Sequence, residues 1–235
     1  MLTLVLLPGM DGTGVLFTDF TVAMQREFES VVVKYPNDPK LGYPELGDLA
    51  REALPRNRPF LLLGESFSGP IAISIAASQP PGLRGLILCC TFARSPHPLL
   101  SLATAALKPL PPARVPAFIQ HRNLFGRFDA PHLRAQLAEV RALVSANTLK
   151  SRLEFVARVD VSDDLRRVAA PILYLRATRD RVVPRAAGEY IKKVRPDAEL
   201  AEFDAPHLLL QTIPREALPA IANFARRSIA ISDAE

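Results

Sequence analysis

Short apolar runs recur along the chain and are separated by segments with a different pattern. The runs are rich in leucine and β-branched residues, and five of them are nearly continuous rather than alternating with polar positions. Continuous runs of this kind are typical of strands that a parallel sheet buries on both faces. The sequence predicts six strands: Thr3–Gly9, Ser30–Pro36, Phe60–Ser66, Gly85–Phe92, Pro171–Asp180 and Ala198–Ala205.

Segments with helical spacing of apolar residues lie between these strands. The predicted helices are Val15–Phe28, Tyr43–Leu54, Gly69–Ser78, Arg185–Lys193 and Arg215–Arg227. Alternation of strands and helices implies right-handed crossovers between parallel strands. We therefore expect an α/β fold with a mostly parallel, doubly wound sheet of about six strands.

One segment, Arg94–Asp160, interrupts the alternation, because no strand is predicted in it. It begins with six prolines between Ser95 and Pro116. A helix follows, whose apolar residues recur at helical spacing: Leu133, Leu137, Val140 and Val144. The segment is too long for a plain crossover. We expect a helical cap, or lid, at residues 94–160 over one edge of an α/β core that comprises residues 1–93 and 161–235.

Composition narrows the class of protein. The 235 residues suffice for one large domain, and the hydrophobic and charged fractions of 49% and 23% are those of a soluble globular protein. No apolar run reaches the roughly 20 residues that a membrane-spanning helix needs. The start, MLTLVLLPG, predicts a strand rather than a signal peptide. Adjacent Cys89 and Cys90 would point to opposite faces of a strand, which disfavours a disulfide and favours a cytoplasmic location.

The segment FLLLGESFSGPIAISIAA places a serine between a buried strand and a helix. Ser66 lies two residues after Gly64 and two before Ser68, which nearly matches the G-x-S-x-G nucleophile elbow. Small residues are needed on both sides because the turn is tight. Ligands of open α/β sheets bind at the carboxyl ends of the strands, so Ser66 is a candidate nucleophile. The alternative is an ordinary helix cap.

A serine nucleophile needs a base and an acid that orients the base. Of the four histidines, only His207 follows a late strand; the others lie in the predicted cap: His97, His121 and His132. Asp180 ends the preceding strand and is the candidate acid. The chain order of serine, aspartate and histidine is the order that accompanies a nucleophile elbow. A helix cap at Asp180 and a surface position for His207 are the structural alternatives. Three other acids compete with Asp180: Asp204, Asp163 and Asp164, of which the last two fit a helix start better.

The loop LLPGMDGTG after the first strand contains glycines that allow close backbone approach. We expect the N–H groups of Met10 and Phe67 to form an oxyanion hole. A phosphate-binding loop is the rival interpretation, but the spacing is GxxGxG and no Lys-Ser or Lys-Thr follows. The chemistry therefore calls for no cofactor and no metal.

Together these motifs resemble the serine hydrolases of the α/β-hydrolase fold, over nearly the whole chain apart from the predicted cap. The residues that carry the resemblance are the elbow at Ser66, the D-x-x-V-P motif Asp180–Pro184, and His207 in a loop that ends at a proline. The stretch DRVVPRAAGEYIKKVRPDAELAEFDAPH is similar to bacterial carboxylesterases that act on pimeloyl-acyl-carrier-protein methyl ester. PGMDGTG has a looser likeness to acyltransferase-type relatives.

The chain also departs from that family's pattern. Pro8 stands where a histidine commonly precedes the glycine of the oxyanion loop, and Pro206 stands where a glycine commonly precedes the histidine. The first two antiparallel strands common in the family are not predicted. These departures remove no reacting group, but they leave the substrate class open.

The predicted cap is basic. Its formal charge is +6, against +5 for the whole chain. A basic rim would attract an acidic partner such as an acyl carrier protein, and solvated helix faces are the alternative. The prediction includes Arg134, Arg141 and Arg152 among the recruiting cations. Nucleic-acid binding is disfavoured, because few aromatic residues and no known reading motif accompany the charge. Apolar residues of the cap would line an acyl pocket or form its core: Leu99, Leu100, Leu102, Leu107, Leu110, Phe118 and Phe125.

The resemblance and the candidate residues together predict a serine carboxylesterase with a Ser66–His207–Asp180 triad and a small-molecule acyl ester substrate. A thioesterase or acyl-carrier-protein ester hydrolase is the first alternative. Acyl transfer to an alcohol and a non-catalytic binding protein that keeps the fold are further alternatives. The acyl length and the alcohol are not predicted.

Overall fold

The computed structural model describes residues 1–56, 58–97 and 117–232. Six strands form one parallel sheet in the order β2-β1-β3-β4-β5-β6. The strands are β1 (Leu2–Leu7), β2 (Phe28–Val32), β3 (Phe60–Glu65), β4 (Leu83–Cys89), β5 (Ile172–Ala177) and β6 (Glu199–Phe203). The predicted fold class is confirmed, and a strand lies in each of the six predicted places.

The region before β2 differs from the prediction. Val15–Phe28 is not one helix: it consists of a 3-10 helix η1 (Val15–Phe17), helix α1 (Thr18–Met24) and the start of β2. Phe28 is buried and pairs with Leu2 of β1, so its apolar side chain serves the sheet and not the helix. The spacing of apolar residues cannot reveal where the helix ends and the strand begins, because a single buried residue such as Phe28 fits both the helical and the strand pattern.

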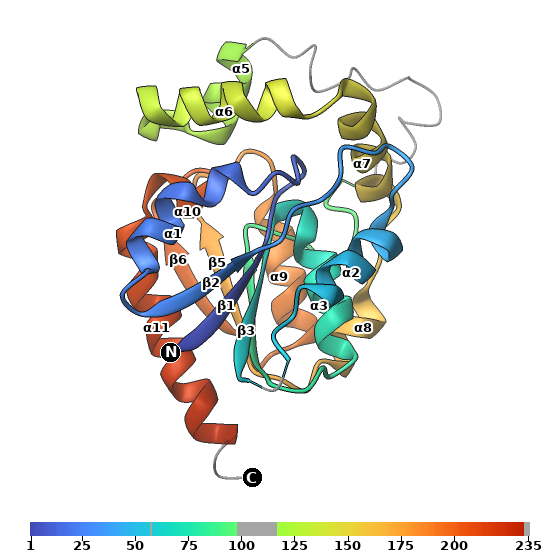
Figure 1. The fold of residues 1–235 in the computed structure, drawn as a ribbon, viewed down its shortest axis with the longest axis vertical. Helices are drawn as coiled ribbons and strands as arrows, with labels where there is room; N and C mark the ends of the chain where they lie inside the picture. Colours follow the sequence, from blue (N-terminus) through green and yellow to red (C-terminus); the bar gives the residue numbers. More distant parts are fainter. Residues whose placement is uncertain (57, 98–116, 233–235) are drawn as a thin grey trace.

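Helices cover both faces of the sheet (Figure 1). One face packs against α2 (Tyr43–Glu52), α3 (Gly69–Ala77), α8 (Ser162–Arg167) and α9 (Arg185–Val194). The other face packs against α1, α10 (Leu209–Thr212) and α11 (Pro214–Ser232). Successive residues of a strand enter opposite clusters; Leu6, for example, packs in one cluster and Leu7 in the other. The nearly continuous apolar runs follow from this burial on both faces.

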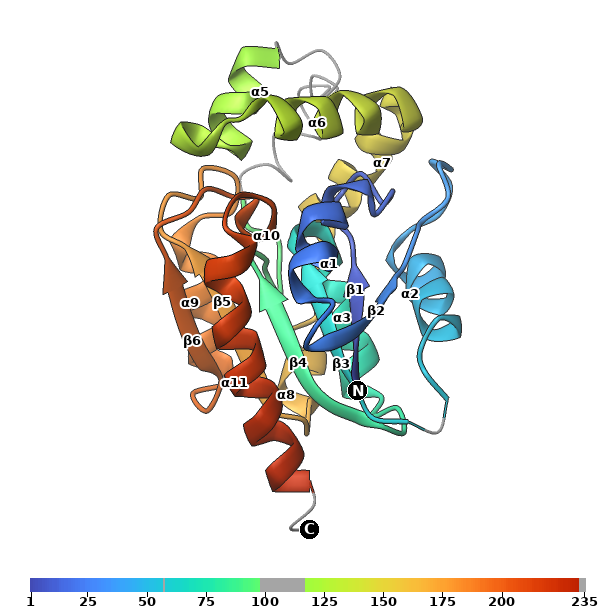
Figure 2. The same ribbon diagram turned by 60° about the vertical axis from the view of Figure 1, so that its left-hand side comes forward.

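Among the described residues between β4 and β5, the helices α5 (Ala117–Leu124), α6 (Pro131–Leu143) and α7 (Ala146–Arg158) lie across the end of the sheet to which the strands point (Figure 1 and Figure 2). We call them the cap helices. The helix predicted from the spacing of Leu133, Leu137, Val140 and Val144 is confirmed as α6. All four side chains are buried, but Val144 follows the last residue of the helix. Arg94 and Asp160 form an antiparallel bridge where the segment leaves and rejoins the core.

The apolar residues of the predicted cap divide into two groups. Phe125 is fully buried in a small core with residues of α6, with Leu16 of η1 and with Leu208 beside the candidate histidine. It is therefore part of a core that joins the cap helices to two loops of the sheet. The other residues predicted to line an acyl pocket lie outside the described part of the chain: Leu99, Leu100, Leu102, Leu107 and Leu110. For Phe118 the structure describes the helical backbone but not the side chain.

The helices of the described ranges were also compared with the length and apolar character that a membrane span requires. None of them meets both requirements. Cys89 and Cys90 are buried free thiols.

Candidate active site

The chain makes a strained turn where β3 ends. Ser66 has a φ of 49°, in the left-handed region that residues other than glycine seldom adopt. The turn continues as a 3-10 helix (Ser66–Ser68) into α3. A Cβ on Gly64 would lie 2.7 Å from the Cβ of Ala72, and one on Gly69 would overlap the Thr91 side chain. The turn therefore needs glycine at both positions, and it lifts the Ser66 side chain to the carboxyl edge of the sheet.

Three side chains predicted from the sequence lie in one hydrogen-bonded chain at this edge. The Nε2 of His207 is 2.9 Å from the Oγ of Ser66, and its Nδ1 is 2.8 Å from the Oδ2 of Asp180. The side chains of His207 and Asp180 are only 4% and 7% exposed. In this arrangement the Nε2 of His207 can accept the serine proton, while the carboxylate stays ionised and holds the imidazole in place.

Asp180 is held by its own turn. Its Oδ1 accepts hydrogen bonds from the N–H groups of Val182 and Val183, at 2.8 and 2.9 Å, and its Oδ2 faces His207. Burial disfavours a positive charge on the imidazole, but the Asp180 carboxylate, with a contribution from Glu65, outweighs burial and raises the pKa of His207. The site therefore stabilises the imidazolium that proton transfer would create.

The competing acids have other partners. Asp204 pairs with Arg127 and Arg179 at the surface. Asp163 and Asp164 lie in the first turn of α8, where they pair with arginines of the same helix. The helix start predicted there is confirmed, and His207 has Asp180 as its carboxylate partner.

Ser68 joins the elbow to the loop after β1. Its hydroxyl donates a hydrogen bond to the carbonyl of Pro8 and lies 2.9 Å from the hydroxyl of Tyr35, and all of these atoms are buried. In the next peptide, the carbonyl of Gly9 accepts from the N–H of Gly12 at 3.0 Å. Serine in the second small position of the elbow thus fastens the loop that carries Met10, a contact that glycine cannot make.

Replacing Ser68 by glycine, which restores the usual elbow pattern, is expected to destabilise the protein by about 1–3 kcal/mol. The reason is that the variant leaves the Tyr35 hydroxyl and the Pro8 carbonyl buried without this partner. Urea unfolding would measure the change. In a double-mutant cycle with Tyr35→Phe, the two losses should sum to more than the loss in the double variant. A Ser68→Gly protein as stable as the wild type would show that the bridge contributes nothing.

The predicted oxyanion donors belong to two segments, the 3-10 helix of the elbow and the loop after β1. Phe67 follows the serine, is almost fully buried, and stacks on Tyr43 with ring centroids 4.8 Å apart. Met10 lies in the loop after β1, and within the described residues its N–H has no hydrogen-bond acceptor. The carbonyls of Met10 and Asp11 both accept hydrogen bonds from Arg152 of α7. The geometry leaves the Met10 N–H available for a ligand.

A buried carboxyl that the sequence interpretation missed lies next to the nucleophile. Glu65, the last residue of β3, is 1% exposed, and both its oxygens lie within 3.3 Å of the side-chain nitrogen of Gln211 in α10. Burial, against the opposing effects of Gln211 and His207, raises the pKa of Glu65 to about 7. The pair links the strand that precedes Ser66 to the helix that follows His207. An acid inside an otherwise apolar run was the only sequence signal for it.

Replacing Glu65 by glutamine is expected to remove a pH dependence of stability. The unfolded carboxyl ionises near pH 4.5 and the folded one near pH 7, so the wild type loses stability as the pH rises through this window. Relative to Glu65→Gln, its free energy of unfolding should fall by roughly 3 kcal/mol, at 1.36 kcal/mol per pKa unit. Urea unfolding across the window measures it, with Glu52→Gln at an exposed position of α2 as the control. A constant difference would contradict the prediction.

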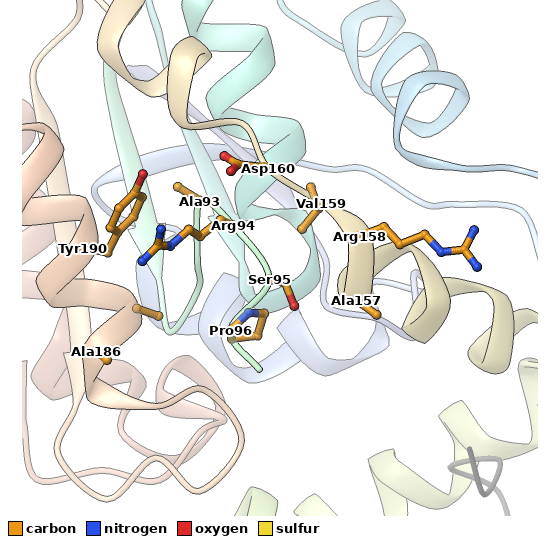
Figure 3. A pocket seen from close by; sticks show the side chains of 11 residues that line it. Ala93, Arg94, Ser95, Pro96, Ala157, Arg158, Val159, Asp160, Ala186 and Tyr190 are labelled. Atoms are coloured by element: carbon orange, nitrogen blue, oxygen red, sulfur yellow. The ribbon is translucent and has the colours of Figure 1, made fainter. Parts of the chain in front are cut away.

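A pocket of about 490 Å³ lies where the segment 94–160 leaves and rejoins the core (Figure 3). The loop after β4, the end of α7 and the start of α9 line it. The guanidinium of Arg94 lies 3.8 Å from the centre of the Tyr190 ring, and Arg158 extends away from both. Ser66, Asp180 and His207 are not among the described residues that line this pocket, so it does not hold the hydrogen-bonded chain.

The structure corrects the prediction about the cap's cations. Arg152 is 1% exposed and so cannot attract a partner from solution. Arg134 is exposed but makes a two-pronged pair with Asp129. Arg141 remains exposed without an ion-pair partner in the described part of the chain, as do Arg122 and Arg158. The charge count was correct, but a count cannot distinguish a buried arginine from an exposed one.

The parallel α/β sheet, with a serine on a strained strand-to-helix turn at its carboxyl edge, is characteristic of α/β hydrolases. The family model described as "Alpha/beta hydrolase family" matches residues 4–218. The chain belongs to this family, and its membership supports a hydrolase.

Solved structures of similar fold include several hydrolases. A lipase-esterase related protein from Clostridium acetobutylicum ATCC 824 has a TM-score of 0.77 and 16% identity, with 94% of this chain and 93% of that chain covered. A thermophilic esterase from Thermogutta terrifontis has a TM-score of 0.76 and 21% identity, with 97% and 90% covered. An enol-lactonase from Burkholderia xenovorans LB400 has a TM-score of 0.70 and 17% identity, with 97% and 91% covered. No curated protein sequence matches the chain.

Proposed function

We propose that the protein is a cofactor-independent serine carboxylesterase. The observation that carries the proposal is the hydrogen-bonded chain from Ser66 through His207 to Asp180 at the carboxyl edge of the sheet. The family supports hydrolysis, and the names of two similar structures include esterase. A carboxylic ester is the substrate class for which this arrangement needs no further group.

In the proposed reaction, the Oγ of Ser66 attacks the ester carbonyl carbon while His207 Nε2 accepts the serine proton. The carbon–oxygen bond to the alcohol then breaks, and the imidazolium gives its proton to the leaving alkoxide. An acyl-enzyme and a free alcohol result. Water attacks the acyl-enzyme with His207 as base, and the acid leaves as Ser66 recovers its proton. Asp180 holds the imidazole in the required tautomer throughout.

The negative oxygen of each tetrahedral intermediate would accept hydrogen bonds from the N–H groups of Met10 and Phe67. Both groups are backbone donors, one on a loop and one on a 3-10 helix, and other contacts hold both segments, so little reorganisation accompanies charge development. Such donors are each worth a factor of about 10² to 10³ in turnover. We also propose that the segment 94–160 acts as a lid over this site, since its cap helices lie across the carboxyl edge of the sheet.

An ester of an acyl carrier protein is a second candidate substrate. It is favoured by three exposed cations of the cap helices that have no ion-pair partner in the described ranges: Arg122, Arg141 and Arg158. Thioester hydrolysis and acyl transfer would use the same nucleophile and base. The cytoplasmic location, and the absence of a cofactor, a metal and nucleic acid from the function, remain predictions.

A panel of p-nitrophenyl esters, thioesters and an acyl-carrier-protein ester, each varied in chain length, tests the proposal. We expect ester turnover and labelling of Ser66 alone by a fluorophosphonate probe, located by peptide mass spectrometry. A carrier substrate recruited by charge should lose kcat/KM steeply with salt, whereas a small neutral ester should not. Failure of all substrates together with failure of the probe to label Ser66 would favour a binding protein that only keeps the fold.

A further inference from the structure

Arg152 is an arginine of α7 that the molecule buries almost completely. Its Nη1 donates hydrogen bonds to the carbonyls of Met10 and Asp11, at 2.9 and 2.8 Å. Its Nη2 donates to the carbonyl of Pro36 at 2.8 Å. The guanidinium therefore reaches from a cap helix into the loop after β1 and binds two successive carbonyls there.

This arrangement does not have the features of an ion pair that stabilises a fold. The partners of the guanidinium are carbonyl oxygens, and no carboxylate lies in ion-pair contact with Arg152 among the described residues. Its Nε is buried without a partner in those ranges. Removing a cation from water is costly, and an apolar side chain of similar length would fill the same space at less cost. Relative to such an apolar side chain, the arginine adds the hydrogen bonds to the loop after β1.

The loop is shaped around the guanidinium. Gly12 has a φ of 74°, and a Cβ there would lie 2.6 Å from the Nη1 of Arg152. The contacts of Arg152 come directly after the Gly9–Met10 peptide, whose N–H is the candidate oxyanion donor. On the other side of this peptide, Ser68 holds the Pro8 carbonyl. The carbonyls of residues 8–11 thus all have protein partners, whereas the Met10 N–H has no acceptor among the described residues.

We propose that Arg152 is a positioning residue of the oxyanion hole: it holds the Met10 and Asp11 carbonyls from α7 and thereby aims the Met10 N–H at the developing oxyanion. The inference rests on the proposed esterase function. It gives the cap helices a part in the reaction as well as in covering the site, because the Met10 loop keeps its conformation only while α7 is in place.

The test compares Arg152→Met and Arg152→Lys with the wild type, using p-nitrophenyl butyrate and an alkyl trifluoromethyl ketone. The ketone adds to Ser66, the serine proton passes to His207, and the resulting oxyanion occupies the oxyanion hole. Fluorophosphonate titration gives the concentration of competent sites, so that kcat refers to folded enzyme. Binding of the product carboxylic acid reports the rest of the site.

We expect Arg152→Met to lower kcat per competent site by about ten- to a hundred-fold, less than loss of a donor itself, which costs about 10² to 10³. The KM and the affinity for the product acid should stay close to wild type. The inhibition constant of the ketone should rise by the same factor as kcat/KM falls, because both depend on the oxyanion contact. The constants of Arg152→Lys should lie between those of the wild type and those of Arg152→Met, since one ammonium cannot span carbonyls in two directions.

Two controls separate positioning from packing. Lys150→Met changes a cation of the same helix whose side chain is 42% exposed and pairs with Glu154, and Leu137→Ala weakens the buried core that α6 forms with Phe125. The first should leave all constants unchanged. The second should lower the melting temperature and the fraction of competent sites, but not kcat per site.

If the wild type is active and Arg152→Met has the same kcat per site and the same ketone affinity, this inference is overturned and the esterase proposal stays intact. A rise in KM together with equal losses of product affinity and ketone affinity would also overturn it, because such a result indicates a distorted pocket. A wild type that neither turns over esters nor binds the ketone would overturn both proposals. If Arg152→Met does not fold, Arg152→Lys decides by the same measurements.

Discussion

Replacement of Ser66 by alanine is expected to lower kcat for p-nitrophenyl esters by a factor of about 10⁴ to 10⁶, to near the background rate. Alanine has no oxygen to attack the carbonyl, so no acyl-enzyme can form. His207 and Asp180 would remain paired through Nδ1 and Oδ2, but the imidazole would have no serine hydroxyl from which to accept a proton. Steady-state kinetics measure the loss, and the p-nitrophenol burst should disappear with it.

The fold should survive this substitution. Alanine experiences the same left-handed backbone strain at residue 66 as serine does, and the flanking glycines are unchanged. Circular dichroism and the melting temperature should match the wild type. Ser78→Ala is a suitable control, because its hydroxyl bonds only the carbonyl of Ile75 at the end of α3. Near-wild-type turnover in Ser66→Ala would remove Ser66 from the mechanism.

Replacement of Asp180 by asparagine is expected to lower kcat by up to about 10⁴. The amide would face the imidazole with a different pattern of donors and acceptors, so Nδ1–H would no longer be held and Nε2 would carry the proton in the wrong tautomer. The asparagine oxygen can still accept from the N–H groups of Val182 and Val183, so the turn should persist with little change in stability.

The same variant should alter the pH profile. The carboxylate of Asp180 raises the pKa of His207, so wild-type activity is lost on acidification as the imidazole becomes protonated. In Asp180→Asn the residual activity should persist to lower pH, because the charged imidazole has lost its partner. This is a shift in the acid limb of kcat/KM, measurable with a neutral ester.

Asp204→Asn provides the matched control. Asp204 lies three positions before His207 in the sequence but pairs with Arg127 and Arg179 at the surface. Turnover should be unchanged in this variant. A loss as large as in Asp180→Asn would transfer the orienting role to Asp204.

The positions of the strands, and the turn at Ser66, could be predicted because their causes are local. A strand buried on both faces must be apolar at nearly every position, and a strained turn before a helix must have small residues at fixed distances from the serine. The order of Ser66, Asp180 and His207 followed from each residue's place at the end of a strand. Parallel strands bring their carboxyl ends to one edge, so residues 141 positions apart could be expected to meet.

Other features depend on contacts for which the sequence has no local signal. Whether Phe28 ends a helix or begins a strand was decided by its pairing with β1. The partner of Glu65, Gln211, comes from a helix 146 residues away. Both alternatives for Phe28 bury an apolar ring, so the pattern alone could not decide between helix and strand. A lone acid in an apolar run gives no information about its partner, so the pattern could not identify Gln211.

The sequence by itself determined the α/β class, the place of the six strands and the candidate residues Ser66, Asp180 and His207, because hydrophobic periodicity and turn chemistry act over a few residues. Only the tertiary structure decided which charges of the cap segment are exposed. Arg152 and Arg141 lie in neighbouring helices, yet one is buried against the Met10 loop and the other faces solvent. The difference arises from what packs against each helix face, and that packing is fixed by the whole fold.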